Sequence, residues 1–216
     1  MSKGRNPHAM NIFVLSCCAA TAATLHCDKH CIKMILETAQ LLYTHLDAVG
    51  LRLPPAKGLK PYKPTHKHHT CALWLHGGRA HFYWLLELGL RLCHVYTKRF
   101  GKVHKTEAHL RHMAAHVHPK ALRKTCDSHV WLKRLKKRGL SPKVLSACAS
   151  KVSTCHPPDG CAFGVVCIAD NTVELQYARN GQIDLTKSYK RLYTFKRKHR
   201  FAMLWNRRPT VPKQLR

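Results

Sequence analysis

The chain has 216 residues and a formal net charge of +28, since 38 lysines and arginines stand against ten aspartates and glutamates. Its apolar share of 45% suffices for one core of ordinary size, which excludes a wholly disordered chain. The charge favours DNA or RNA as partner, because Lys and Arg that bind phosphates release counterions from the nucleic acid. No segment is long and apolar enough to cross a membrane.

The start of the chain allows two interpretations. Residues 1–9 are predicted to form an extension before a helical core that spans residues 10–140. A basic stretch followed by apolar residues 12–20 also resembles a signal peptide, but the apolar run is short and Ser16 interrupts it, so we expect a folded element and no secretion. Residues 12–15 fit a short strand or an extended lead-in segment, and small residues follow at 19–24.

The next pattern predicts a helix over residues 28–49, with Asp28 as its cap and Gly50 at its end. Apolar residues recur at helical spacing and predict one buried face, formed by Ile32, Ile35, Leu36, Ala39, Leu42, Tyr43 and Leu46. Glu37 lies off that face. This carboxylate suits a base or an electrostatic stabiliser beside bound phosphate, or simply an i,i+4 partner for Lys33.

The middle of the chain predicts further helices. A Pro-rich and Lys-rich loop covers residues 53–64, and a helical region follows at 71–100, with a break at Gly77–Gly78 and an end at Gly101. Two more helices are expected at 106–118 and at 126–138, the second very basic. The fold class is therefore mainly α.

Residues 141–216 are predicted to be a basic segment packed on the core. Residues 161–168 and 172–177 fit a small β-hairpin, and residues 185–203 fit a basic helix. In that helix, cations alternate with Tyr189, Tyr193, Phe195 and Phe201. Such a composition suits contacts with phosphates and bases, and it equally suits a solvated helix that packs its aromatic residues inward.

Eleven cysteines and 18 histidines raise the question of zinc. Cys27 and Cys31 stand one helical turn apart, and a second group is formed by Cys155, His156, Cys161 and Cys167. Neither spacing matches a paired C-x-x-C site, so we expect no cofactor and mostly reduced thiols buried as small apolar groups, with a structural zinc as the alternative. The apolar settings of Cys17, Cys18, Cys27, Cys31, Cys71, Cys93, Cys126 and Cys148 support burial.

Four segments of the chain have recognisable motifs, namely Met10–Leu15, Cys27–Gln40, Tyr62–His66 and Tyr96–Lys102. Together they resemble a largely uncharacterised family of small proteins from phages and large DNA viruses. That family is distantly similar to the phage-type pyrimidine-dimer DNA glycosylase, endonuclease V. The shared sequence motifs are Asp-x-His with a Glu nine residues after the Asp, and Pro-Thr before the aromatic second helix. Two more are Lys-Arg before the Gly that ends that helix, and Arg-Pro-Thr near the end of the chain.

The resemblance implies a compact all-α glycosylase-like core in which Glu37 takes the place of the catalytic glutamate. In such an enzyme an amine attacks C1′ of a flipped nucleotide and forms a Schiff base, and the glutamate assists. Lys33 is a candidate substitute for the amine. Three departures favour binding over catalysis: residues precede Met10, Leu36 and Gln40 replace flanking arginines, and Val211 replaces an aromatic residue.

The sequence therefore predicts a basic nucleic-acid-binding protein on a glycosylase-like scaffold. An active glycosylase with abasic-site lyase activity and a structural component of a capsid or ribonucleoprotein remain alternatives. If the protein is viral, we expect it in the virion or in the host cytoplasm or nucleus. The predicted nucleic-acid contacts are Lys29, His30, Lys63, His66, Lys98, Arg99, Lys102, Lys196, Arg197, Lys198 and Arg200.

Overall fold

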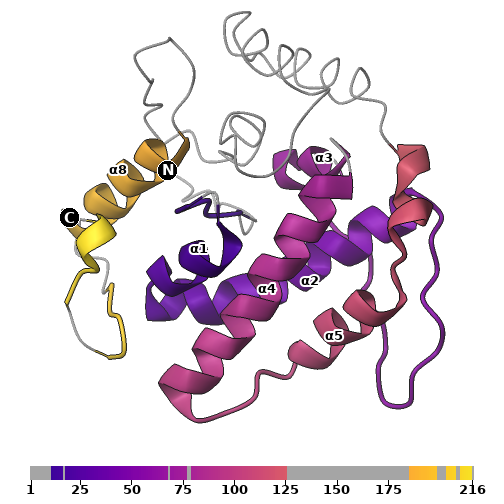
Figure 1. Ribbon diagram of the computed structural model, residues 1–216, viewed down its shortest axis with the longest axis horizontal. Helices are drawn as coiled ribbons and strands as arrows, with labels where there is room; N and C mark the ends of the chain where they lie inside the picture. Colours follow the sequence, from indigo (N-terminus) through magenta and orange to yellow (C-terminus); the bar gives the residue numbers. More distant parts are fainter. Residues whose placement is uncertain are drawn as a thin grey trace, which may run out of the picture.

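The computed structural model describes residues 11–16, 18–67, 69–76, 79–125, 185–198, 203–207 and 210–215. In this part of the chain the fold is mainly α, as predicted (Figure 1). The elements are α1 (Ala19–Leu25), α2 (Asp28–Ala48), α3 (Thr70–Leu75), α4 (Arg79–Phe100), α5 (Glu107–His116), the 3-10 helix η1 (Pro119–Thr125), α8 (Leu185–Lys198) and the 3-10 helix η3 (Lys213–Leu215). The predicted hairpin at 161–177 and the helix at 126–138 lie outside the described residues.

Two glycines end long helices where the sequence predicts it. Gly50 has a φ of 72° and Gly101 a φ of 67°, a left-handed conformation that glycine adopts without a Cβ clash. At the end of α2, the N–H of Leu51 donates to the carbonyl of Leu46 and the N–H of Gly50 donates to that of Asp47. This pair of bonds is a Schellman motif, which satisfies the last carbonyls of the helix.

The central helix is α4, which contacts α1, α2, α3 and α5. Gly89 allows the close approach of two of these neighbours. A Cβ at this position would lie 2.7 Å from Cγ2 of Thr38 and 2.9 Å from Cδ1 of Leu110. Since real Cβ atoms do not approach other atoms so closely, a larger residue would push α4 away from α2 and α5.

The buried face of α2 differs from the predicted one. Ile32 and Leu36, which we expected inside, are exposed, whereas Met34, Leu41 and Glu37 are buried. The reason is that α2 is covered by α4 on one side and by residues 11–13 and α8 on another, so its buried sector is rotated relative to the apolar stripe. The segment before α1, expected as a strand or a lead-in, has no strand pairing at residues 12–15.

Asp28 does not cap α2 as predicted. The N-cap is Cys27, and no side chain caps the helix. The carboxylate of Asp28 instead accepts bonds from Arg99 Nη1 at 3.0 Å, the N–H of Asn206 at 3.1 Å and the N–H of Arg207 at 2.7 Å. Asn206 and Arg207 have φ values of 51° and 61°, so their successive N–H groups converge on one anion.

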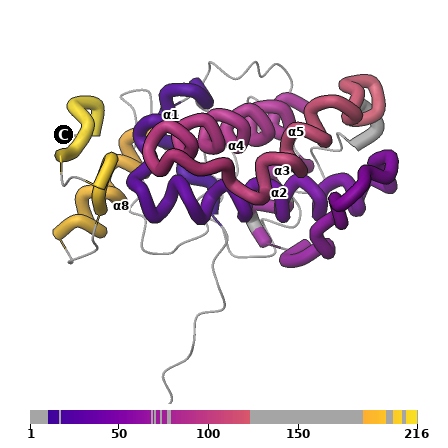
Figure 2. The backbone as a smooth tube through the Cα atoms, turned by 90° about the horizontal axis from the view of Figure 1, so that it is seen from below, coloured from indigo at the N-terminus to yellow at the C-terminus, as the bar shows by residue number. Residues whose placement is uncertain are grey.

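These bonds attach the C-terminal segment to the start of α2. Trp205 adds to them, since its indole N–H donates to the carbonyl of Leu25 at 2.9 Å. In both overall views α8 and the C-terminal residues lie at the end of the molecule where α2 begins (Figures 1 and 2). Residues about 180 positions apart in sequence thereby become neighbours.

The described cysteines are mostly buried. Cys27, Cys31, Cys71 and Cys93 lie inside the core, as predicted, whereas Cys18 is exposed, because it precedes the first turn of α1 at the surface. Burial raises the pKa of the Cys31 and Cys93 thiols to about 12, so both stay protonated. Among the described helices, none is long and apolar enough to span a bilayer.

Candidate functional site

The lead-in segment, taken here as residues 11–15, lies between α2 and α8, and two of its residues contact different turns of α2. The backbone N–H of Asn11 donates to Oε2 of Glu37 at 3.1 Å. The ring of Phe13 stacks on the ring of His30, with centroids 4.3 Å apart and an angle of 10° between the planes. Glu37 and His30 are seven residues apart on α2, so they occupy one face at a separation of two turns.

Glu37 is buried, with 5% of its surface exposed, yet one of its partners reaches solvent. Its Oε1 lies 3.0 Å from Nζ of Lys33, whose side chain is 51% exposed. The i,i+4 pair considered from the sequence is thus present. The second partner, the N–H of Asn11, comes from a segment 26 residues away, so the carboxylate also fixes the lead-in segment against the helix.

Asn11 is held through its side chain as well. Its Oδ1 accepts the N–H of Ile12 at 2.8 Å and the hydroxyl of Tyr189 at 3.0 Å. Tyr189 is fully buried on α8. The position of the Asn11 nitrogen opposite Glu37 therefore depends on a helix 178 residues further along the chain.

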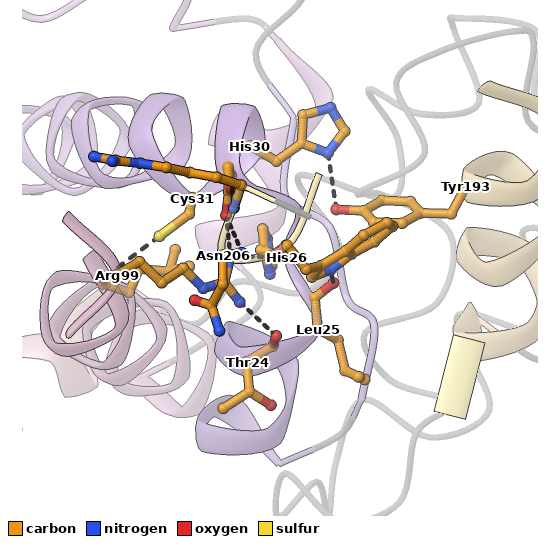
Figure 3. Close-up of polar contacts among 12 residues, drawn as sticks. Thr24, Leu25, His26, His30, Cys31, Arg99, Tyr193 and Asn206 are labelled. Carbon is orange, nitrogen blue, oxygen red and sulfur yellow. Dashed lines mark hydrogen bonds and ion pairs between the residues drawn. The ribbon is translucent and has the colours of Figure 1, made fainter. Parts of the chain in front are cut away.

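Beside Phe13, α2 and α8 form a second polar pair (Figure 3). Nδ1 of His30 and the hydroxyl of Tyr193 share a hydrogen bond of 2.8 Å, and the two side chains face each other from α2 and α8. Nζ of Lys196 lies 5.4 Å from the centroid of the Phe13 ring, on which His30 stacks. Tyr189, Tyr193 and Lys196, at spacing i, i+4 and i+7, thus form the inner face of α8.

This arrangement keeps both members of the second pair neutral. Burial lowers the pKa of His30 well below its ordinary value, and the positive charges of Lys196 and Lys33 lower it further. Burial also raises the pKa of Tyr193 well above 10. The cluster of Asn11, Phe13, His30, Lys33, Glu37, Tyr189, Tyr193 and Lys196, named here the segment cluster, therefore combines a buried carboxylate, a neutral imidazole and two lysines.

The outer face of α8 is basic. The sequence of the helix contains six lysines and arginines and no carboxylate. Four of these cations are exposed, and Phe195 is exposed among them, whereas Tyr189, Leu192 and Tyr193 are buried. The exposed cations are Lys187, Arg191, Arg197 and Lys198. The inward packing expected by one interpretation is confirmed for Tyr189 and Tyr193. Contacts of the exposed residues with phosphates and bases stay a prediction.

The other predicted nucleic-acid contacts have different settings. Lys29 is exposed on α2, and further exposed residues lie on loops and on α4, namely Lys63, His66, Lys98 and Lys102. Arg99 differs, because its guanidinium bonds to Asp28 and to the carbonyls of His26 and Thr24 (Figure 3). These bonds give Arg99 a structural role. Arg200 lies outside the described residues.

Metal ligands do not gather in the part of the chain that the structure describes. No group of three or more His, Cys, Asp or Glu side chains there could hold a metal ion. The proposed ligands Cys155, His156, Cys161 and Cys167 lie outside the described residues, so the sequence prediction about zinc stays a prediction. Comparison of the chain with protein-family models, with curated proteins and with solved structures gave no match.

Sequence reasoning did not single out Asn11 and Phe13 as site residues. Both stand in the segment Met10–Leu15, for which the sequence predicts a strand or a lead-in and a family resemblance, but no site. Tyr189 and Tyr193 were noted as aromatic residues of a basic helix, but their spacing with Lys196 was the stronger signal, because it defines one helix face. No local signal connects that face with Glu37 or His30.

Proposed function

We propose that the protein binds nucleic acid through its basic surface, on a scaffold that resembles a DNA glycosylase. The observation that carries the proposal is the outer face of α8, where exposed cations occur without any carboxylate on the helix. Phosphates would contact these exposed cations, and the release of counterions from the nucleic acid would supply the affinity. The net charge of +28 favours the same kind of partner over the whole chain.

Salt titration tests this proposal. The affinity for a DNA duplex should fall steeply as salt rises, with little dependence on sequence. Replacement of Lys187 and Arg191 by Gln should weaken binding uniformly and reduce the slope of log K against log salt by up to about 2. Lys57→Gln with Lys60→Gln is a matched control, since both lysines are exposed on the loop at the other end of the molecule. Equal effects of the two pairs would contradict an α8 interface.

A second candidate function is a Schiff-base lyase centred on Glu37. The observation that favours it is the 3.1 Å contact between the Asn11 nitrogen and Oε2 of Glu37. In a chain that began at Asn11, this nitrogen would be an α-amine beside a buried carboxylate, which is the pairing that amine attack on C1′ requires. The peptide bond to Met10 makes it a non-nucleophilic amide in the full sequence.

Borohydride trapping on abasic DNA separates the two candidates. The full chain should give no trapped adduct above a Glu37→Gln control, because its Asn11 nitrogen is acylated. A chain trimmed to begin at Asn11 should give an adduct that depends on Glu37 if the lyase exists. A Lys33→Ala variant belongs in the same assay, since the amine of Lys33 lies 3.0 Å from Oε1 of Glu37. An adduct from the full chain that Lys33→Ala abolishes would assign the nucleophile to Lys33.

A further inference from the structure

Two histidines contact each other on the last turn of α5. His112 and His116 stand at i,i+4 spacing, so their side chains lie on one side of the helix. The centroids of their rings are 4.3 Å apart, with an angle of 49° between the planes. His116 is exposed and His112 is half-buried. Ions from the solvent can therefore reach both imidazoles.

Backbone carbonyl groups fix the tautomers of the two rings. Nε2 of His112 lies 2.9 Å from the carbonyl oxygen of Pro54, and Nδ1 of His116 lies 2.9 Å from that of His112. A carbonyl oxygen only accepts, so each of these two nitrogens is the donor and carries the proton. In the neutral rings, the lone pairs then belong to Nδ1 of His112 and Nε2 of His116. Histidines that bind metals are oriented in the same way, because their second nitrogen donates to a carbonyl or a carboxylate.

The spacing of the rings suits one ion between them. Bonds from zinc to imidazole nitrogen are about 2.0–2.1 Å long, so two nitrogens that share an ion lie about 3 Å apart. Rings whose centroids are 4.3 Å apart reach that separation by small side-chain rotations. Two histidines at i,i+4 on a helix are also an established pair of zinc ligands. The pair is smaller than the three-ligand groups that the described residues lack, so water supplies the remaining ligands.

The charge of α5 permits a cation there, despite the charge of +28 on the whole chain. α5 contains one carboxylate and one guanidinium, and Oε1 of Glu107 lies 2.6 Å from Nη2 of Arg111. α8, in contrast, contains six cations and no carboxylate. The residues between the two histidines, 113–115, are uncharged. A divalent ion between the imidazoles therefore meets no charged side chain on the turn that holds it.

We propose that His112 and His116 form a chelating site for a divalent transition-metal ion that prefers imidazole, namely Ni²⁺, Cu²⁺ or Zn²⁺. Among these ions, Cu²⁺ should bind most tightly, as it does to most nitrogen ligands. The site is independent of the proposed nucleic-acid binding, and α5 lies away from α8 in both overall views (Figures 1 and 2). A bound ion adds positive charge to the ring of His112, which strengthens its bond to Pro54 and fastens that loop to α5.

Equilibrium dialysis of the full chain against Ni²⁺ alone tests the site. The wild type should retain one Ni²⁺ more per chain than the double variant His112→Gln with His116→Gln. The result is read as a difference, because the other histidines and the cysteines of the chain also bind this ion. The single variant His116→Gln leaves the bond to Pro54 in place and keeps an amide that can donate to the carbonyl of His112. It should lower the affinity of the site about a hundredfold, since only one imidazole remains.

A matched control removes two imidazoles that do not face each other. His94 and His118 are exposed, and Nδ1 of His118 already accepts the N–H of Lys120. His94→Gln with His118→Gln should therefore retain as much Ni²⁺ as the wild type. Equal retention by the wild type and by His116→Gln at every Ni²⁺ concentration would overturn the site. An equal loss in the control would overturn it as well, because any pair of exposed histidines would then have the same effect.

Discussion

Two buried carboxylates on α2, nine residues apart, are held in different ways. Asp28 is paired with Arg99, and both side chains are at most 10% exposed. Its remaining acceptor capacity goes to two backbone N–H groups of Asn206 and Arg207. Glu37 is held by one backbone N–H and by Lys33, a cation that is half exposed.

The difference distinguishes a carboxylate with a structural role, Asp28, from one that can exchange a partner, Glu37. Every partner of Asp28 is fixed in the folded protein, so a ligand could reach it only by displacing the C-terminal segment. Lys33 is half exposed and can turn into water, and another cation or donor can then take its place at the buried carboxylate of Glu37, which is costly to leave unpaired. Glu37 can therefore change partners within the folded state, which a residue that serves substrate must do.

The largest expected effect is on stability at Asp28. Asp28→Ala should lower the free energy of unfolding by about 3–5 kcal/mol, because it leaves the Arg99 cation buried and unpaired. Two N–H groups lose their acceptor as well. Urea denaturation measures this loss. Asp47→Ala is the control, since Asp47 pairs with Lys67 at the surface and its loss should matter far less. Similar costs for the two variants would remove the distinction between fixed and exposed pairs.

The sequence predicted the ends of α2 and α4 because Gly50 and Gly101 act locally. It also placed the acid Glu37 beside Lys33, which follows from helix geometry alone. The prediction that Ile32 and Leu36 are buried was wrong, because an apolar stripe does not show which neighbouring elements cover a helix or on which sides. The role of Asp28 was missed for a similar reason, since its partners Asn206 and Arg207 stand 178 and 179 residues away.

The segment cluster shows the same limit. Asn11, Phe13, Tyr189 and Tyr193 are ordinary residues in their local contexts, and each acquires its role from a contact with a distant element. Periodicity finds faces of helices, and the chemistry of an acid in a basic chain, together with the resemblance, singled out Glu37. Neither periodicity nor resemblance could show that the lead-in segment lies between α2 and α8, because this position depends on tertiary packing between distant parts of the chain.

A third polar residue of α2 sharpens the comparison through pH. His45 is buried, and neither of its ring nitrogens has a hydrogen-bond partner among the residues that the structure describes. Burial, together with the smaller effects of the nearby His76 and His81, lowers the pKa of His45 to about 3. The neutral form is therefore required in the folded protein, whereas the unfolded chain takes up a proton below a pH of about 6.5.

The contribution of neutral His45 to the free energy of unfolding should therefore be fully present above pH 6.5. It should be lost progressively as the pH falls towards 3. His45 contributes up to about 1.4 kcal/mol per pH unit in this window, or about 2 kcal/mol between pH 6.5 and 5. Burial also lowers the pKa of His26 and of His81 to about 4, so both add to the slope. His45→Leu should reduce the slope measured by urea denaturation at several pH values. An unchanged slope would mean that His45 is protonated in the folded state.

The smallest expected effect on stability is at Glu37. Glu37→Gln keeps the size of the side chain, and its amide oxygen can still accept the N–H of Asn11. The lost partner is Lys33, which is exposed and can bind water instead. We therefore expect a loss of about 1 kcal/mol or less in the free energy of unfolding, measured by urea denaturation at pH 7. Unchanged salt-dependent DNA binding by the same variant would show that Glu37 does not contribute to the basic interface. A loss as large as that of Asp28→Ala would instead make Glu37 a second structural carboxylate, with no freedom to serve a substrate.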